Sequence, residues 1–312
     1  MAAIWKKRLY LSEPVISKIT NIVPSVISKK IDSSVKGYRK FSIPKHQGGR
    51  REILSPRPSL ACVQTAIATR LHSCVDFSES VHAYVPKKSV ITNALAHVEG
   101  KNFLKVDIEN FFPSITSSLI RRTFSDHCHN DKTMELLLKF CTLKNSLPQG
   151  APSSPMISNI VMGPLDEILG AYSKSNSLNY TRYADDIIIS GDKITIDDRD
   201  TVYSFIENYG LTVNAKKSVL INSGRKVIIT GISISRNRLC VPRKSKRKIR
   251  QQAHLVVKNG IIHESKKKGV FDPFYVDRVL GRLSFWNQVE PNNPYPIKHL
   301  ALIKGMLSDL VK

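Results

Sequence analysis

Two adjacent acids stand between segments that have the composition of strands. Asp185 and Asp186 follow the aromatic stretch 179–183 and precede three isoleucines at 187–189. Unpaired carboxylates are costly to desolvate, so a buried strand seldom carries two of them unless a cation compensates their charge. A hairpin turn that uses aspartate for local hydrogen bonds is the simpler explanation, and it suffices for an isolated Asp-Asp pair.

A third acid favours a metal site over a simple turn. Asp107 lies near the end of the apolar segment 102–108, which we expect to be a buried strand. If this strand lies beside 179–190 in one sheet, three carboxylates converge on one point. Such a cluster suits two Mg²⁺ ions, one to activate an attacking 3′-hydroxyl group and one to bind a triphosphate and the leaving pyrophosphate.

The elements expected around these acids alternate between helices and short strands. The spacing of apolar residues predicts helices over 13–35, 58–75, 89–98, 116–125 and 132–142, a long helix after Pro152 that Ser153 or Ser154 caps, and a helix over 198–209. Strands are expected over 40–44, 51–55, 102–108, 179–182, 186–190, 219–221, 227–235 and 239–241, with turns at 46–49 and 236–238. Helical patterns around 244–258, 274–289 and 296–311 follow, which predicts an α+β body and then a small helical domain beyond about 240.

The charge of the chain points to a polyanionic partner. Its 48 Lys and Arg residues stand against 25 Asp and Glu, a formal net charge of +23. Nucleic acid is the leading candidate partner and an anionic membrane surface the second. No apolar run is long enough to predict a membrane span. The densest basic segment favours phosphate contacts over a solvated helix face; its basic residues are Arg243, Lys244, Lys246, Arg247, Lys248 and Arg250.

The cysteines indicate the compartment rather than a site. There are five, an odd number, and their scattered positions do not form a disulfide framework. This pattern favours a reducing cytoplasm. His127, Cys128 and His129 lie close together, but no second pair of ligands follows at the spacing of a zinc site.

With Asp107, the Tyr-Ala-Asp-Asp segment 183–186 resembles the catalytic triad of bacterial and other reverse transcriptases, which are RNA-directed DNA polymerases. Leu-Pro-Gln-Gly-Ala-Pro-Ser-Ser-Pro at 147–155 and Gly-Leu-Thr-Val-Asn-Ala-Lys-Lys-Ser at 210–218 resemble two further blocks of that family, in the same order. The resemblance covers about residues 40–240. It implies a right-hand polymerase fold with two Mg²⁺ ions on the three acids. N-terminal helices and fingers would span 1–100, a palm with an antiparallel sheet 101–240 (fingers elements at 115–150), and a helical thumb 241–312.

The same resemblance implies roles in binding the incoming nucleotide. Phe112 would be the steric gate that excludes a ribose 2′-hydroxyl, with Phe111 as the core neighbour with which it can be confused. Gln149 would contact the deoxynucleotide, its alternative being a simple turn into the next helix. Arg51 would clamp the triphosphate, and Arg50 is its competitor.

Further roles concern the leaving group and the primer. Lys217 resembles the lysine that protonates the departing pyrophosphate, with Lys216 as the alternative. Thr230 and Gly231 lie where reverse transcriptases support the primer end, although a glycine bulge in a strand would explain Gly231 equally well.

Three segments resemble the retron subgroup. These are Asn-Ala-Leu-Ala-His at 93–97, Gln-Gly-Ala-Pro-Ser-Ser-Pro at 149–155, and Ile-Thr-Gly at 229–231 in place of the usual Val-Thr-Gly. Asn93 and His97 are candidate RNA contacts, unless they serve as a helix cap and a core histidine. The resemblance implies a bacterial enzyme that binds its own non-coding RNA, primes from a guanosine 2′-hydroxyl and makes branched msDNA. It also implies anti-phage defence with a separate effector protein, with which the enzyme would form a larger assembly.

Two other functions remain open at this stage. One is a different prokaryotic reverse transcriptase, either of the group II intron type or an abortive-infection polymerase that needs no template. The Asn-Ala-x-x-His segment argues against both. The other is a scaffold that binds RNA and an effector, which is compatible with catalysis because all three acids are present.

Overall fold

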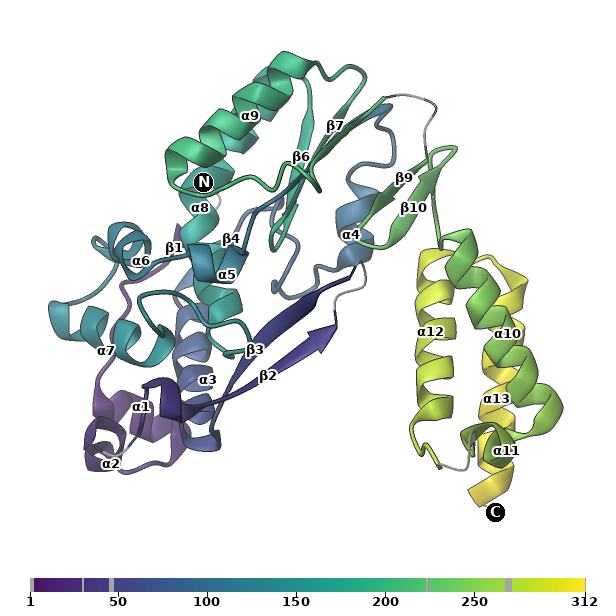
Figure 1. Ribbon diagram of the computed structural model, residues 1–312, viewed down its shortest axis with the longest axis horizontal. Helices are drawn as coiled ribbons and strands as arrows, with labels where there is room; N and C mark the ends of the chain where they lie inside the picture. The colour runs from purple at the N-terminus through teal and green to yellow at the C-terminus, as the bar shows by residue number, and fades with distance from the viewer. Residues whose placement is uncertain are drawn as a thin grey trace. The chain divides into compact units, whose positions relative to one another are not determined.

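The computed structural model describes residues 3–29, 31–44, 48–222, 224, 226–266 and 271–311 (Figure 1). The turn residues His46 and Gln47, expected from the sequence, lie outside these ranges. Contacts divide the chain into two units, Met1–Ser89 with Gly100–Ser223 and Val90–Glu99 with Gly224–Lys312.

A four-stranded antiparallel sheet is the centre of the first unit. Its order is β6 (Asn179–Tyr183), β7 (Asp186–Gly191), β5 (Asn102–Asp107) and β8 (Val219–Ile221). We expected the strand that ends at Asp107 to lie beside the hairpin that carries the acidic pair. The pairing of β5 with β7 confirms this expectation. Alternate side chains of β5 and β7 point to one face of the sheet, where they enter the core: Leu104, Val106, Ile187 and Ile189.

Helices supply the rest of this core. The most buried is α8 (Ser154–Ser175), which packs on β6 and on α3 (Pro58–His72). Others that contribute are α6 (Ser117–Phe124), α7 (Asp131–Cys141) and α9 (Ile196–Tyr209). The expectation of a serine cap on α8 was wrong. Ser153 makes no side-chain capping bond, and the Ser154 hydroxyl instead donates to the Pro148 carbonyl oxygen at 2.8 Å.

The single helix expected over 13–35 is two helices and a short turn. They are α1 (Glu13–Thr20), α2 (Pro24–Lys29) and the 3₁₀ helix η1 (Val35–Gly37). Asn21 ends α1 in the left-handed conformation with φ 58°. A left-handed residue ends a helix, and the residue before a proline avoids the helical region. The break before Pro24 thus has a local cause that apolar spacing did not reveal.

Two antiparallel strand pairs complete the sheet structure of the first unit. The long one joins β2 (Tyr38–Pro44) to β3 (Arg50–Pro56), with Ile43 opposite Arg51. A short pair joins β1 (Ala3–Trp5) to β4 (Val75–Phe77), so α3 ends before residue 75, the expected limit of the helix. The one-turn helix α5 (Phe111–Ser114) was not predicted because it is too short to show a period.

The second unit combines a small sheet with a helical bundle. The sheet consists of β9 (Val227–Ile229), β10 (Ile232–Ser235) and β11 (Arg238–Cys240), and α4 (Val90–Leu95) packs on β9 and β10. We expected one strand over 227–235; the positive φ angles of Thr230 and Gly231 divide it. The division between the units thus falls before the small sheet and not near 240. The limits of fingers, palm and thumb stay a prediction.

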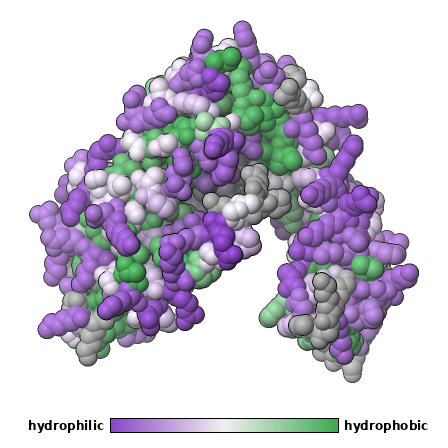
Figure 2. All heavy atoms as spheres, in the orientation of Figure 1, coloured by the Kyte–Doolittle hydropathy of each residue, from purple (hydrophilic) through white to green (hydrophobic). Residues whose placement is uncertain are grey.

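The bundle consists of α10 (Arg243–Asn259), α11 (Ile261–Ser265), α12 (Tyr275–Val289) and α13 (Pro294–Val311). Trp286 is fully buried and stacks on Tyr295, with ring centroids 5.4 Å apart. The face of these helices seen in Figure 2 is largely hydrophilic. Within the described ranges, no helix combines the length and the apolar character that crossing a membrane requires.

Candidate active site

The three acids meet at one end of the four-stranded sheet. Asp107, the last residue of β5, is the register partner of Asp186, the first residue of β7. Directly opposed residues of antiparallel strands project their side chains to the same face. Asp185 lies in the turn before β7, where Ala184 has a φ of 57°. The Ile108 amide donates to the Asp185 carbonyl oxygen at 3.4 Å and so ties the turn to the end of β5.

Negative charge accumulates at this point. Burial, and then the charge of Asp185, raises the pKa of Asp186 to about 6. Burial also raises the pKa of Asp185, and the charge of Asp107 adds to the rise. Lys105 and Lys217 act in the opposite direction on Asp186 without cancelling these effects. The cluster therefore holds more negative charge than its protein neighbours compensate.

Lys217 neutralises part of this charge. Its Nζ atom lies 3.1 Å from both carboxylate oxygens of Asp107, whose side chain is only 14% exposed. The backbone brings them together, because the Asn214 amide donates to the Asp107 carbonyl oxygen at 2.8 Å and the Asp107 amide to Ser218 Oγ at 3.1 Å. The neighbouring Lys216 is exposed. Of the two lysines singled out in the sequence, Lys217 contacts the acids.

The acids suit a divalent metal ion although their side chains are not arranged around one. In the part of the chain that the structure describes, no three histidine, cysteine, aspartate or glutamate side chains are grouped to hold a metal. Both carboxylate oxygens of Asp107 instead contact the Lys217 ammonium group. Carboxylates are the ligands that Mg²⁺ prefers. The raised pKa values of Asp185 and Asp186 mark negative charge that a cation would relieve.

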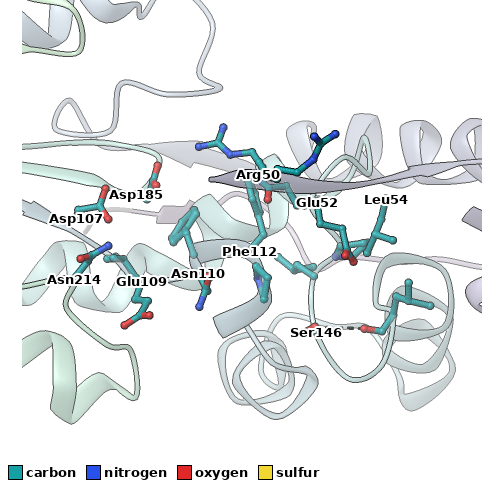
Figure 3. A pocket seen from close by; sticks show the side chains of 18 of the residues that line it. Arg50, Glu52, Leu54, Asp107, Glu109, Asn110, Phe112, Ser146, Asp185 and Asn214 are labelled. Carbon is teal, nitrogen blue, oxygen red and sulfur yellow. Dashed lines mark hydrogen bonds between the residues drawn. The ribbon is translucent and has the colours of Figure 1, made fainter. Parts of the chain in front are cut away.

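A pocket of about 530 Å³ opens beside the acids (Figure 3). This volume lies in the range of small-molecule sites. Figure 3 shows Asp107 and Asp185 at one end and Phe112 between them and the β3 residues Arg50 and Glu52. Six residues with a predicted role in catalysis or nucleotide binding line it together: Arg51, Asp107, Phe112, Gln149, Asp185 and Lys217. The alternatives Arg50 and Phe111 line it as well.

The two arginines of β3 differ in their contacts. Arg50 is held by β2, since its Nε donates to Ser42 Oγ at 2.7 Å and its NH2 to the Ser42 carbonyl oxygen at 3.3 Å. The charge of Arg51 lowers the pKa of Asp185, which counters the larger effect of burial. Both line the pocket, but Arg51 is the one whose charge reaches the acids.

The loop that carries Gln149 is fixed to β3. The Leu54 amide donates to the Gln149 carbonyl oxygen at 2.8 Å. Gly150 has a φ of 119°, and a Cβ atom there would lie 2.9 Å from Ile53 Cγ2 and 3.0 Å from the Leu54 carbonyl oxygen. Only glycine fits this contact and this backbone conformation without strain. The close approach places Gln149 and Arg51 on the same pocket.

The two phenylalanines of α5 take different positions. Phe111 is buried in the core, whereas Phe112 is only partly buried and packs against that core; both residues line the pocket. Their ring centroids are 5.3 Å apart. Asn110 precedes them in the left-handed conformation with φ 48° and turns the chain sharply after β5. Phe112 is the more exposed of the two rings, and its role as a gate stays a prediction.

Other pocket residues were missed in the sequence. Tyr84 has a φ of 60°, which is unusual for a bulky side chain. Burial raises its pKa, the charge of Asp185 adds to the rise, and the charge of Arg51 opposes it. It lies in an irregular loop, so no period marks it. Glu109, Asn110 and Asn214 also line the pocket. In the sequence, only their positions could have indicated a role in the pocket: Glu109 and Asn110 follow the strand that ends at Asp107, and Asn214 lies in the loop of Lys217.

The residues predicted to contact RNA or primer lie in the second unit. Asn93 and His97 are fully buried, which agrees with the alternative of core residues, so direct RNA contact by them stays a prediction. Thr230 and Gly231 form the turn between β9 and β10, and the Thr230 hydroxyl donates to the Val90 carbonyl oxygen at 3.3 Å.

The basic residues of α10 fall into two groups. Lys246 faces the bundle, where its Nζ lies 2.7 Å from Glu290 Oε1 and 5.4 Å from the Trp286 ring centroid. Arg250 lies over the same ring and over Tyr295. These two contacts serve the bundle itself. The other four side chains are exposed and available to phosphate: Arg243, Lys244, Arg247 and Lys248.

Comparisons with known proteins agree with the fold. The family model described as "Reverse transcriptase (RNA-dependent DNA polymerase)" matches residues 43–248. The chain belongs to this family. It is 30% identical over 243 residues to the Retron Ec86 reverse transcriptase of Escherichia coli, covering 77% of this chain and 76% of that protein. It is 30% identical over 270 residues to the Retron Ec83 reverse transcriptase of the same species, covering 81% and 83%.

These relatives show a retron-type reverse transcriptase with RNA-directed DNA polymerase activity, as expected from the sequence. A solved telomerase from Candida albicans, in complex with a fragment of telomeric RNA, has a TM-score of 0.50 and 12% identity. That similarity covers 89% of this chain and 58% of the telomerase, and it concerns the fold alone. The expected mixed polymerase fold with antiparallel sheets is confirmed.

Proposed function

We propose that the enzyme copies a cognate structured non-coding RNA into branched msDNA, with synthesis primed from an RNA 2′-hydroxyl group. The observation that carries the chemical part is the pocket that joins Asp107 and Asp185 to Arg51, Phe112 and Gln149. Acids that suit a metal, a cation for the triphosphate and a ring for the sugar are the parts that templated nucleotidyl transfer requires. The RNA-related part rests on the retron-type relatives.

The three acids would hold two Mg²⁺ ions. Bound Mg²⁺ supplies Lewis-acid stabilisation of the attacking and leaving oxygens. Asp107 must exchange its ion pair with Lys217 for this role. Lys217 is then free to donate a proton to the pyrophosphate as it departs.

The remaining pocket residues bind and select the deoxynucleotide. Arg51 offers a guanidinium fork to the triphosphate oxygens. The ring of Phe112 occupies the space that a ribose 2′-hydroxyl would need, and it offers that hydroxyl no hydrogen bond. Gln149 presents an amide to the sugar or the base edge. The fixed loop of Gln149 on β3 keeps these contacts in register with the acids.

The template and primer would be bound by the second unit. The exposed basic residues of α10 would contact phosphates, and the turn at Thr230 and Gly231 would support the primer end. Asn93 and His97 would then act from the core, by shaping the surface around α4. Association with a separate effector in anti-phage defence, in a larger assembly, completes the proposal.

The decisive experiment purifies the protein from cells that also express the RNA encoded beside it. Branched msDNA should accompany the wild type and be absent from the Asp185→Asn, Asp186→Asn double variant. Normal msDNA from that variant would overturn the catalytic assignment. RNA that is bound but never copied, even by the wild type, would support the scaffold alternative instead.

A second assay separates templated from untemplated synthesis. The purified protein is given poly(rA)/oligo(dT), Mg²⁺ and either dTTP or a nucleotide that does not pair with the template. Incorporation of dTTP alone is expected. Equal incorporation of the unpaired nucleotide would favour a polymerase of the abortive-infection type.

A further inference from the structure

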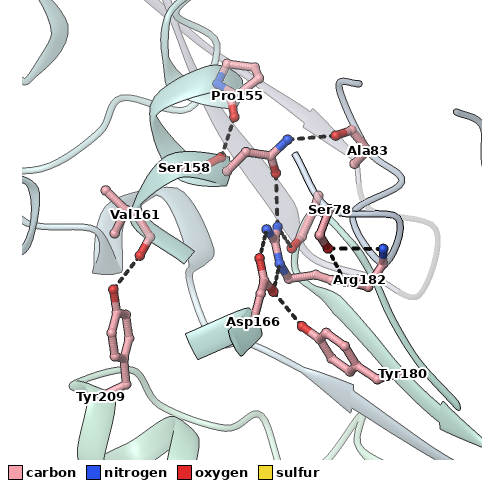
Figure 4. A network of polar contacts seen from close by, with 12 residues as sticks. Ser78, Ala83, Pro155, Ser158, Val161, Asp166, Tyr180, Arg182 and Tyr209 are labelled. Carbon is pink, nitrogen blue, oxygen red and sulfur yellow. Dashed lines mark hydrogen bonds and ion pairs between the residues drawn. The ribbon is translucent and has the colours of Figure 1, made fainter. Parts of the chain in front are cut away.

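A buried ion pair lies behind the catalytic turn. The Arg182 and Asp166 side chains are both 0% exposed. They form a two-pronged contact, with Arg182 Nε 2.7 Å from Asp166 Oδ1 and Arg182 NH2 2.6 Å from Asp166 Oδ2 (Figure 4). Tyr180 donates its hydroxyl to the same Oδ1 at 2.5 Å. The pair therefore joins β6 to the middle of α8.

The third guanidinium nitrogen reaches the turn that carries the acids. Arg182 NH1 donates to the carbonyl oxygen of Ala184 at 3.2 Å. Ala184 is the left-handed residue directly before Asp185. Non-glycine residues are seldom left-handed, and such a conformation persists where the surroundings impose it. The bond from Arg182 is one such constraint, and it acts on the peptide that leads into Asp185.

The same nitrogen also links the turn to a second loop. Arg182 NH1 donates to Asn159 Oδ1 at 3.0 Å, and Asn159 Nδ2 donates to the Ala83 carbonyl oxygen at 2.8 Å. Ala83 precedes Tyr84, which lines the pocket. The backbone of Arg182 adds bonds to the same loop, from its amide to the Ser80 carbonyl oxygen and from the His82 amide to its own carbonyl oxygen.

We propose that Arg182, held by Asp166, is a positioning residue that fixes the Asp185 turn and, through Asn159, the Tyr84 loop. A planar fork makes these contacts at the same time, whereas a lysine ammonium cannot reproduce their geometry. A buried ion pair by itself contributes little to net stability compared with apolar residues of the same size. Its contacts to the two pocket loops give it a role that apolar residues could not take over.

The test compares Arg182→Lys with Tyr180→Phe. The lysine keeps the buried charge but loses the simultaneous contacts to Ala184 and Asn159. The phenylalanine removes the hydroxyl that interacts with Asp166 and Arg182, and it leaves the bonds from Arg182 to Asp166, Ala184 and Asn159 in place. Binding of Mn²⁺ to the metal-free protein, followed by electron paramagnetic resonance, should weaken about 10-fold or more in Arg182→Lys and stay unchanged in Tyr180→Phe. Incorporation of dTTP on poly(rA)/oligo(dT) should show kcat lowered about 10- to 100-fold in Arg182→Lys alone.

Asn159→Ala provides a second arm that keeps the buried ion pair intact. It breaks the link to Ala83, so it should raise KM for dTTP and leave Mn²⁺ binding unchanged. If Arg182→Lys does not fold, this split between KM and metal binding still decides the question. If Asn159→Ala and Tyr180→Phe lower kcat and weaken Mn²⁺ binding to the same extent, the network has only a structural role. That result would overturn the proposal.

The inference rests on the proposed role of Asp185 as a metal ligand, and the two can fail separately. If the wild type binds no Mn²⁺ that depends on Asp185, as judged with Asp185→Asn, the proposed metal site fails. If the wild type binds Mn²⁺ through Asp185 and Arg182→Lys binds it equally well, only the positioning role fails.

Discussion

Lys217 places its ammonium group 3.1 Å from each carboxylate oxygen of Asp107, the acid that faces Asp186 across the sheet. Lys217 thereby forms an ion pair with one acid of the cluster, while the charges of Lys105 and Arg51 act on the other two. The same position lets it act on a leaving group once Asp107 has taken another partner.

We expect Lys217→Met to lower the rate of dTTP incorporation about 100-fold, because loss of a general acid typically costs two orders of magnitude or more. Single-turnover kinetics on poly(rA)/oligo(dT) measure this effect directly. Lys216→Met is the matched control. The Lys216 side chain is exposed, so its replacement should leave the rate unchanged. Equal losses in both variants would show that general positive charge, and not the placed ammonium, is responsible.

Arg51→Ala should raise KM for dTTP about 10- to 100-fold, since a hydrogen bond to a charged group is worth about 1.5–3 kcal/mol. Arg50→Ala removes contacts to Ser42 that stay within the hairpin, so its effect on KM should be much smaller. Steady-state titration with dTTP distinguishes them. A larger effect of Arg50→Ala would exchange the assignments of the two arginines.

Phe112→Ala should reduce discrimination against ribonucleotides about 10-fold or more, because it removes the group that fills the space of a 2′-hydroxyl. The ratio of kcat/KM for dTTP to that for UTP is the measurement. Phe111→Leu, which alters only the buried ring, should lower the melting temperature and keep the ratio. Unchanged discrimination in Phe112→Ala would mean that another residue is the gate.

The sequence was most informative where chemistry constrains the residue type. Asp107, the acidic pair and Lys217 were all found from motifs, and the structure brings them together on one sheet. Motifs could not separate Phe111 from Phe112 or Arg50 from Arg51, because neighbouring residues of one kind differ only in the direction of their side chains. Contacts made through the backbone, such as the carbonyl oxygens of Ala83 and Ala184, leave no mark in residue types. The role of Arg182 was invisible for this reason.

Stability should depend on pH through His82. Burial, and then the charge of Lys88, lowers the pKa of His82 from 6.5 to about 4. Below pH 6.5 the unfolded chain takes up a proton at this imidazole, while the folded protein does not until about pH 4. Unfolding therefore gains a proton in this window, and the stability present above pH 6.5 is lost as the pH falls toward 4.

Urea denaturation of the metal-free protein at pH 7 and pH 5 measures this loss. In His82→Gln, which cannot titrate, the difference between the two midpoints should be smaller than in the wild type. His72→Gln replaces an exposed histidine and should keep the full difference. An undiminished pH dependence in His82→Gln would assign it to other groups.

The segment 80–82 has a second consequence, for association between molecules. β6 is an edge strand of the central sheet, and exposed edges are templates onto which other chains add strands. The bonds between Arg182 and residues Ser80 and His82 occupy that edge, with Val81 bridged to Arg182 in parallel. At the opposite side β8 has only three residues. The edges of the sheet that carries the acids are thus protected against pairing with strands of other molecules. Variants that loosen segment 80–82 should therefore aggregate under conditions in which the pocket is still folded.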